Sequence, residues 1–301
     1  MDIKQLHYFV TVCDQLSYSK AAQKLHISQP SLSNAIKNLE REVGSPLLER
    51  NTRKIELTDA GKILYEKSIL LLSNMNMLKK EMDEVRLTGN GELIIGIIES
   101  VKYWIPKVIR EYQGRFPSIN FKLIEVLGGR AVKESLRKYH THMLITNQYI
   151  CEEDIELLSL YDERLVLVLH KDHPLAQKET VALKELESEP FIISTEGFQT
   201  REDILRAFSL EQVSPNIKFE IERFETALTL VRENLGITII PENYLSEPND
   251  ASLVWKTMDS PALKRTVYLA FMKNRYLAPA VQAFLEDIRR SFATKSRFPL
   301  V

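Results

Sequence analysis

Short polar side chains form a row within the segment SQPSLSNAIKNLEREVG, residues 28–44. Ser31, Ser33 and Asn34 can each donate and accept hydrogen bonds, and Lys37 adds a positive charge further along the same segment. Short hydroxyl and amide side chains allow a helix to come close to the edges of DNA bases, while a lysine attracts phosphate. The chemistry available to this row is therefore recognition through hydrogen bonds and charge, without bond making.

The residues between these polar side chains indicate how the row is presented. Leu32, Ile36 and Leu39 recur at helical spacing, so a helix that buries them turns the polar row outward. Pro30 suits the first turn of that helix, because the N–H that proline lacks would have no partner within the helix there. Amphipathic patterns over residues 4–25 predict two helices just upstream. Together these helices predict a helix-turn-helix, whose second helix enters the major groove of DNA.

A cationic stretch follows the predicted recognition helix. Two short apolar runs, LLE and IEL, flank the sequence RNTRK, which predicts a small hairpin, or wing, with positive charges at its tip. Between Lys20 and Lys54 seven basic side chains stand against three acidic ones, although the formal net charge of the whole chain is −1. Any contact with nucleic acid must therefore be local to this end of the chain.

The candidate DNA contacts combine the polar row with these cations. Serine, asparagine and glutamine side chains are the candidate base readers, and the lysines and arginines would hold phosphates. The alternative is that the row is an ordinary solvated helix face. The predicted DNA-binding residues are Ser28, Gln29, Pro30, Ser31, Ser33, Asn34, Lys37, Arg50, Arg53 and Lys54.

A long helical pattern without proline runs over residues 58–87. Leu64, Leu71, Leu78 and Val85 repeat every seven residues along it, which predicts a seam against a partner helix. The turn residues of TGNGE end the helix and mark a domain boundary. This seam predicts an oligomer of identical chains.

The remainder of the chain alternates short apolar runs with amphipathic ones, which predicts an α/β architecture with mainly parallel sheets. The strands are expected over residues 92–99, 119–126, 142–146, 164–170, 190–194, 217–221, 236–241 and 266–272. The helices are expected over residues 107–116, 131–139, 201–208, 225–234 and 279–292.

Several classes of protein lack support in this sequence. Two cysteines, Cys13 and Cys151, are too few for a disulfide framework and fit a reducing compartment. The first ten residues do not resemble a signal peptide, and no apolar stretch is long enough to cross a membrane. Catalytic motifs are not found in residues 91–301, so no enzyme activity, cofactor or metal is expected. We expect a cytoplasmic protein without membrane contacts.

Residues 6–61 resemble the winged helix-turn-helix domain of LysR-type transcriptional regulators, a bacterial family, through the pattern AAQKLHISQPSLSNAIKNLEREVGSPLLER. The segments LVLVLHKDHPLAQKETVALKELESEPFIIS and LVRENLGITIIPE are similar to parts of that family's effector domain. The resemblance implies an α+β multidomain fold with a bilobal effector domain like a periplasmic binding protein. It also implies a regulator that binds an interrupted inverted repeat in double-stranded DNA as a homodimer or homotetramer, with RNA polymerase as a further candidate partner. The implied division is a DNA-binding domain over 1–58, a linker and dimerisation helix over 59–88, and an effector domain over 89–301, with subdomain I at 91–163 plus 268–301 and subdomain II at 164–267.

The resemblance places an effector in the cleft between the two subdomains, against three loops that each open a helix. Helix amino-termini offer free N–H groups and favour anions, so a small carboxylate is the expected effector. The candidate effector-binding residues are Ser100, Lys102, Gly129, Arg130, Thr195, Gly197, Phe198, Thr200 and Arg201. Each of the glycines and arginines has the alternative of an ordinary turn or surface ion pair.

Other interpretations of the same residues remain open. The second domain has the alternative of an enzyme or solute-binding protein with a docking module in front. A structural coiled-coil adaptor is a third interpretation, but it does not explain the outward row of serine and asparagine side chains. His140 and His142 alternate onto one strand face but lack a third metal ligand nearby. Cys151 has the alternatives of a redox sensor and an ordinary loop thiol, and Cys13 is expected in the core.

Overall fold

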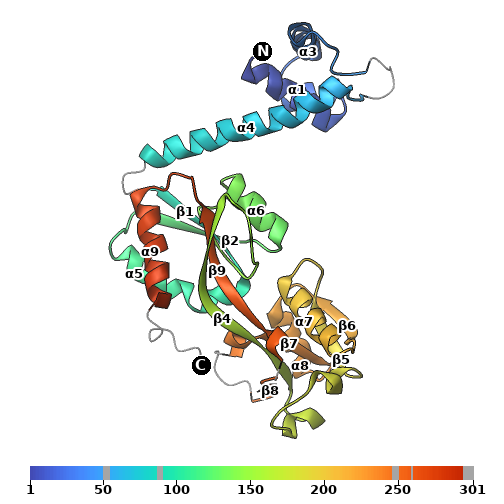
Figure 1. Cartoon of the computed structure of the whole chain (residues 1–301), viewed down its shortest axis with the longest axis vertical. Helices are drawn as coiled ribbons and strands as arrows, with labels where there is room; N and C mark the ends of the chain where they lie inside the picture. The colour runs from blue at the N-terminus through green and yellow to red at the C-terminus, as the bar shows by residue number, and fades with distance from the viewer. Residues whose placement is uncertain (50–54, 87–90, 246–250, 259, 294–301) are drawn as a thin grey trace. The chain divides into compact units, whose positions relative to one another are not determined.

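The computed structural model describes residues 1–49, 55–86, 91–245, 251–258 and 260–293, which Figure 1 traces from the amino-terminus in blue to the carboxyl-terminus in red. The chain divides into two compact units, residues 1–83 and 84–301. Each unit has hydrophobic clusters of its own, so each can be understood from its own residues.

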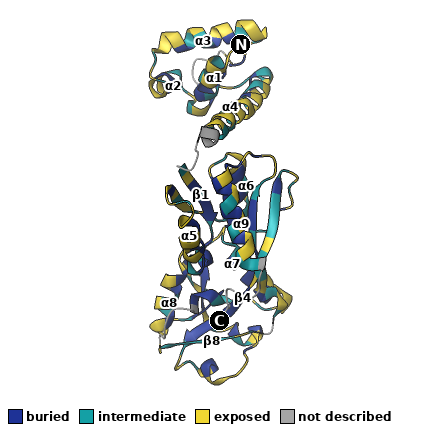
Figure 2. Cartoon of the chain, turned by 90° about the vertical axis from the view of Figure 1, so that its left-hand side faces the viewer, coloured by how far each residue is buried: buried dark blue, intermediate teal, exposed yellow. Residues whose placement is uncertain are grey.

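Three short helices build the first unit: α1 Ile3–Gln15, α2 Tyr18–Lys24 and α3 Gln29–Val43. Their apolar faces pack into a single cluster, as the amphipathic patterns predicted. The largest contributions come from Phe9, Leu32, Ile36, Leu39 and Leu47, none of which is more than 1% exposed. Figure 2 shows this burial as dark faces turned toward one another, with exposed residues outside.

Side chains at the helix starts satisfy backbone N–H groups that no helical partner could reach. Asp2 and Gln5 form a capping box at α1. Ser17 caps α2, and Ser28 Oγ accepts a hydrogen bond from Ser31 N at 3.3 Å at the start of α3. Gly44, with φ of 77°, ends α3 in the left-handed conformation that glycine adopts without strain. Local sequence therefore sets both ends of α3.

The segment after α3 returns as a two-stranded stem. Leu48 and Leu57 form an antiparallel bridge, and Glu49 N donates to Glu56 O at 2.8 Å. This stem confirms the predicted hairpin, whose tip lies outside the described residues. The Glu40 carboxylate of α3 accepts from Leu47 N at 2.8 Å, so the stem is tied directly to α3.

Helix α4, Asp59–Arg86, confirms the long helix predicted after the wing. Several apolar side chains along it are exposed in the single chain, among them Leu71 at 41%, Leu78 at 53% and Met82 at 50%. Leu71 and Leu78 are predicted seam positions, and Met82 lies one turn beyond Leu78. Leaving so many large apolar side chains in water is unfavourable, and this exposure favours a partner surface.

The second unit is built on strands that come from both of its halves. They are β1 Gly91–Ile97, β2 Ile119–Glu125, β3 Met143–Thr146, β4 Ile155–His170, β5 Pro190–Ser194, β6 Asn216–Ile221, β7 Ile237–Pro241, β8 Leu253–Lys256 and β9 Lys264–Met272. Their spatial order is β2-β1-β3-β9-β4-β7-β5-β6, with β8 also paired to β4. This order separates one group of strands around β1 from another around β5.

Two long strands connect these groups. β4 pairs antiparallel with β9 as far as Arg164 and then, from Leu165, pairs with β7 and β8 instead. One end of β9 also pairs with β3, at Leu144 to Thr146. Figure 1 shows β4 and β9 running side by side from one subdomain into the other. The exchange of partners at residue 164 is what divides the unit into two subdomains.

Helices cover both faces of each strand group. α5 Ile105–Gln113 and α9 Pro279–Ala293 pack together over the first group, with Tyr112 and Phe284 in their core, and α6 Gly129–Arg137 packs against β3 and β9. α7 Gln199–Leu210 and α8 Phe224–Arg232 contribute to two separate clusters around the second group. Short 3₁₀ turns complete the unit: η1 Glu99–Tyr103, η2 Pro174–Gln177, η3 Leu183–Leu186, η4 Glu242–Leu245 and η5 Pro261–Leu263.

The expectation of mainly parallel sheets was wrong in one respect. Pairs around β1 and around β5 are parallel, but every pairing of β4 and β9 is antiparallel. The first half of β4 and the whole of β8 were also missed. Residues 155–163 are mostly half-exposed and carry no continuous apolar run, so their sequence lacks the signal of a buried strand.

A test of the packing in the second unit is available at Gly236, just before β7. A Cβ at this position would lie 2.4 Å from the carbonyl oxygen of Pro190, so alanine would push β5 and β7 apart. We expect Gly236→Ala to lower the free energy of unfolding by about 1–3 kcal/mol, measured by urea denaturation. Gly114→Ala is the control, because its Cβ would meet Glu111 O at an ordinary 3.4 Å. Equal midpoints for the two variants would contradict this account of the β5–β7 contact.

Candidate functional site

The outer face of α3 carries polar side chains that the rest of the protein does not use. Gln29, Asn34 and Lys37 are exposed and Ser33 is half-buried. Within the described ranges none of these four makes a side-chain hydrogen bond or ion pair. Such a face can offer its full set of donors and acceptors to an external partner.

Other residues at the start of α3 stabilise the helix itself. Ser28 and Ser31 share a hydrogen bond of 2.8 Å between their hydroxyls, in addition to the cap. Pro30 is exposed in the first turn, where it stabilises the helix start as predicted. Ser28, Ser31 and Pro30 therefore set the start of the helix as well as lying on its outer face. The predicted wing contacts Arg50, Arg53 and Lys54 lie outside the described residues.

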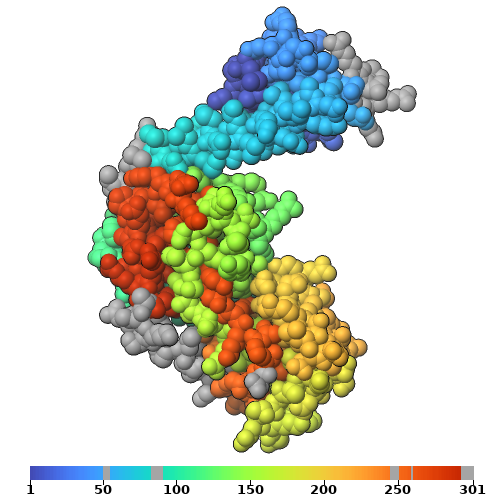
Figure 3. Space-filling model, viewed as in Figure 1, coloured from blue at the N-terminus to red at the C-terminus, as the bar shows by residue number. Residues whose placement is uncertain are grey.

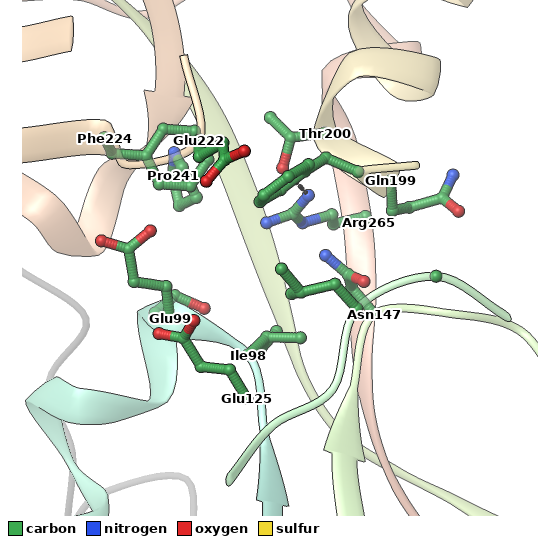
Figure 4. Close-up of a pocket in the computed structure, with 14 residues that line it drawn as sticks. Ile98, Glu99, Glu125, Asn147, Gln199, Thr200, Glu222, Phe224, Pro241 and Arg265 are labelled. Carbon is green, nitrogen blue, oxygen red and sulfur yellow. Dashed lines mark hydrogen bonds between the residues drawn. The ribbon is translucent and has the colours of Figure 1, made fainter. Parts of the chain in front are cut away.

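A pocket lies in the second unit where the subdomains meet. Water-sized molecules can occupy about 30 Å³ of it, and the pocket opens to solvent. Figure 3 shows the surface indented between the subdomains, and Figure 4 shows the side chains that line the pocket. Three loops form its walls: those after β3 and β6, and the turn η1. The end of β2, the start of α7 and strand β9 complete them. Those residues include Glu99, Ser100, Glu125, Asn147, Phe198, Gln199, Thr200, Glu222 and Arg265.

Two loops approach each other closely at the mouth of this pocket. Gly128 opens α6 with φ of 79°, and Gly197 precedes α7 with φ of 92°. A Cβ on Gly128 would lie 3.2 Å from the carbonyl oxygen of Gly197. Neither helix has a side-chain cap, so the first N–H groups of α6 and α7 are available near the cleft. These groups favour a negatively charged ligand atom.

Arg265 lies on the same wall and is held by buried groups. Its Nε and Nη2 donate to one oxygen of Glu163 at 2.8 and 2.6 Å, and its Nη1 donates to Thr200 Oγ1 at 2.7 Å. The side chains of Arg265 and Glu163 are 7% and 0% exposed. β4, β9 and α7 are thereby joined at the pocket, and the guanidinium is fixed in orientation.

The opposite wall of the pocket is acidic. Glu99 hydrogen-bonds to Glu225 across the two subdomains, and burial together with this bond raises the pKa of Glu99 to about 7. The same bond lowers the pKa of Glu225 to about 2. Lys102 pairs with Glu225, and Arg223 pairs with Glu125, so charged contacts bridge the subdomains beside the pocket. Ring contact between Tyr103 and Tyr244, at 5.3 Å, adds an apolar bridge.

Comparison with family models covers nearly all of the chain. Residues 3–62 match the bacterial regulatory helix-turn-helix protein model of the lysR family, and residues 88–293 match the LysR substrate binding domain. The chain belongs to the LysR family. The family consists of transcriptional regulators, so the alternatives of an enzyme, a solute-binding protein and a coiled-coil adaptor are excluded.

Individual LysR-type proteins match over their full length. The HTH-type transcriptional regulator AlsR of Bacillus subtilis (strain 168) is 30% identical, over 95% of this chain and 94% of AlsR. The Hca operon transcriptional activator HcaR of Escherichia coli (strain K12) is 29% identical, over 98% and 99% of the two chains. The crystal structure of full-length BenM is 29% identical, with a TM-score of 0.59, over 99% and 100%. The bilobal α/β fold expected for the effector domain is therefore confirmed.

The predicted effector residues fall into three groups in the structure, of which two line a pocket or hollow and one does not. Ser100, Phe198 and Thr200 line the pocket. Gly129, Arg130 and Gly197 line a wider hollow at its mouth, and Arg130 pairs there with Glu134 at 3.1 Å. Lys102, Thr195 and Arg201 line neither space.

Local contacts explain why those three side chains lie elsewhere. Arg201 donates to Ser194 O at 2.7 Å and to Glu220 at 3.0 Å, so its charge is directed toward β5 and β6. The Thr195 backbone N–H extends the β5–β6 pairing by donating to Ile221 O. Lys102 is drawn to Glu225. Sequence proximity to a cleft loop did not determine side-chain direction.

Among the polar side chains that line the pocket, six were missed from the sequence: Glu99, Glu125, Asn147, Gln199, Glu222 and Arg265. Glu125, Asn147 and Glu222 end or follow strands that were predicted, so the rule that ligands bind beyond the carboxyl ends of parallel strands would have found them. Arg265 gave no such signal, because it lies within β9 and reaches the pocket only through the pairing with β4.

The structure also places the histidine and cysteine residues that the sequence analysis considered. His142 is buried, and its Nδ1 accepts a hydrogen bond from Ile94 N at 2.9 Å. No cluster of three potential metal ligands occurs in the described residues. Cys13 is buried, as expected, and burial raises the pKa of its thiol to about 12, while Cys151 is exposed. Among the described helices, none has the length and apolarity needed to span a membrane.

The raised pKa of Glu99 makes a prediction about stability. Between about pH 4.5 and 7 the folded protein keeps a proton that the unfolded chain releases, so this group makes stability fall as pH rises through that window. Glu99→Gln removes the ionisation. We expect the melting temperature of this variant, minus that of the unmodified protein, to be roughly 2–4 °C higher at pH 8 than at pH 5. This corresponds to a change of about 1 kcal/mol in the free energy of unfolding.

Calorimetry of the full chain at both pH values measures this difference. Exposed Glu153 offers the control Glu153→Gln, which should track the unmodified protein at both values. A Glu99→Gln variant that gains nothing between pH 5 and 8 would show that Glu99 ionises in the ordinary range.

Proposed function

We propose that α3 reads the DNA sequence of an operator, with Gln29, Ser33 and Asn34 contacting bases and Lys37 holding a phosphate. The observation that carries this proposal is the unused polar face of α3, described above, within a domain of a DNA-binding family. Ser28, Pro30 and Ser31 would support the helix start at the backbone. Arg50, Arg53 and Lys54 are proposed phosphate contacts on the basis of charge alone.

Gel-shift titration against the DNA upstream of the protein's own gene, with a scrambled duplex beside it, tests these roles. Ser33→Ala should reduce the ratio of affinities for the two duplexes several-fold, because it removes a base contact. Lys37→Ala should weaken both duplexes alike and lower the salt slope by about one, because it removes a phosphate contact. Lys67→Ala, an exposed lysine on α4, is the matched control. Unchanged binding by both α3 variants would refute the assignment of this face.

We also propose that the chain works as a homodimer or homotetramer through the apolar seam of α4. Two identical domains would then read the two halves of an interrupted inverted repeat. Exposed Leu71, Leu78 and Met82 support the proposal, since a second copy of the helix would cover them.

Light scattering of the purified chain tests the seam. Leu78→Glu should shift the protein toward monomer and weaken operator binding at least tenfold, because a charge replaces an apolar contact. Asn76→Glu adds the same charge at an exposed polar position of α4 and should leave the assembly intact. A Leu78→Glu protein with the mass of the unmodified oligomer would exclude this seam.

The cleft of the second unit is the proposed effector site, and we propose a small molecule with a carboxylate group as its ligand. Support comes from the uncapped starts of α6 and α7 and from Arg265 and Thr200 on the same wall. A regulator of this kind would act in the cytoplasm, where its DNA lies, with RNA polymerase as a proposed further partner. Effector binding would act by favouring one arrangement of the subdomains.

A further inference from the structure

The pocket has two walls of opposite character. Figure 4 shows the carboxylates of Glu99, Glu125 and Glu222 on one side. Across from them lie Thr200 and Arg265, close to the start of α7. A plain carboxylate would suit the second wall but would leave the carboxylates of Glu125 and Glu222, and the partly protonated Glu99, facing the rest of the ligand.

The charges of the acidic wall are only partly compensated by the protein. Glu125 has Arg223 as its partner, and Lys102 lies 3.8 Å from Glu99 while also pairing with Glu225. Glu222 has no ion pair or hydrogen bond in the described part of the chain. Its carboxylate is exposed and lines the pocket, so it is available to a ligand.

The cation of the other wall does not offset this excess. Arg265 is already paired with Glu163, and Asp203 lies 3.6 Å from it. The guanidinium can still orient an anionic group, because the bonds to Glu163 and Thr200 use three of its five N–H groups. Its charge, however, is balanced within the protein. The pocket as a whole therefore retains excess negative charge at the acidic wall, which favours a positive group of a ligand there.

A buried hydroxyl supplies an independent sign of a ligand at this place. Ser100 is 2% exposed and lines the pocket. Its Oγ completes no hydrogen bond of ordinary geometry within the described ranges, although the Tyr161 hydroxyl lies near it. Buried hydroxyls rarely lack a partner, so a ligand atom in the pocket would satisfy this one.

We propose that the effector is a zwitterion of the amino-acid type, with an ammonium group at Glu222 and Glu99 and a carboxylate at the start of α7, Thr200 and Arg265. This inference rests on the proposed effector role of the cleft and names the ligand class for it. The ammonium group supplies the charge that the acidic wall lacks, and the carboxylate uses the free N–H groups opposite. A molecule with only one of these groups would leave one wall without its partner.

Matched sets of small molecules test the proposal on the full-length protein. Each of the common amino acids is compared with the carboxylic acid that lacks its amino group and with the amine that lacks its carboxylate. Melting temperature is measured first, and calorimetric titration then gives affinities. We expect at least one amino acid to stabilise the protein, and its acid and amine to bind at least tenfold more weakly.

The other outcomes separate this inference from the proposed function. If an acid binds as tightly as its amino acid, the zwitterion is refuted while the carboxylate effector stands. If an amine binds as tightly, the carboxylate contacts are refuted. If no compound of the three classes binds, both the zwitterion and the carboxylate effector are overturned, although DNA recognition by α3 is unaffected.

A variant pair locates the ammonium site. Glu222→Gln should weaken the amino acid about tenfold and leave the matched carboxylic acid unchanged or tighter, because only the positive group loses its partner. Glu233→Gln changes an exposed carboxyl just after α8, outside the pocket, and is the matched control. Equal loss for the amino acid and the acid in Glu222→Gln would contradict the assignment of the acidic wall.

Discussion

The ion pair between Glu163 of β4 and Arg265 of β9 is the contact on which the effector unit depends. The two residues are opposite one another in the antiparallel register, next to the point where β4 exchanges β9 for β7 and β8. Both side chains are buried, and Asn243 adds a hydrogen bond to Glu163. Removing one partner of such a pair costs about 3–5 kcal/mol, because the other is left charged and buried. The same interaction thus fixes the strands that cross between the two subdomains and the orientation of Arg265.

That interaction also links the crossing strands to the pocket between the subdomains. Thr200 accepts a hydrogen bond from Arg265 in the first turn of α7, where the N–H groups lack a side-chain cap. A group bound at the start of α7 would therefore contact the second subdomain and, through Arg265, the strands shared with the first. The charged bridge from Arg223 to Glu125 joins the subdomains on the opposite wall. A ligand between these walls has contacts with both halves, which is what an effector needs in order to favour one arrangement over another.

The amino-terminal unit uses polar residues in a different way. Ser28 and Glu40 are committed within the unit, one to the start of α3 and the other to the backbone of Leu47. These bonds hold the helix and the stem, and leave Asn34 and Lys37 free on the outer face. A surface that reads DNA requires both properties, because a fixed backbone gives register and free side chains give base contacts. In the cleft, by contrast, Glu125 and Arg265 are already engaged in ion pairs, and Glu222 is left without a partner in the described part of the chain.

The amino-acid sequence alone determined the helix-turn-helix, the long α4 helix and most strands of the effector domain. These elements follow from periodicity and local caps, such as Leu32 and Ile36 on one face of α3 and Ser28 at its start, which act over a few residues. The resemblance to LysR-type regulators placed Ser100, Phe198 and Thr200 at the cleft, and all three line the pocket. Only the tertiary structure showed that Glu222 and Arg265 share this pocket with Glu99, and that Arg201 turns away from it. Glu99 and Arg265 are far apart in the chain, and they meet because β4 and β9 cross between the subdomains. The charge balance of a site assembled in this way is a property of the folded molecule, since no local pattern records which side chains will face each other.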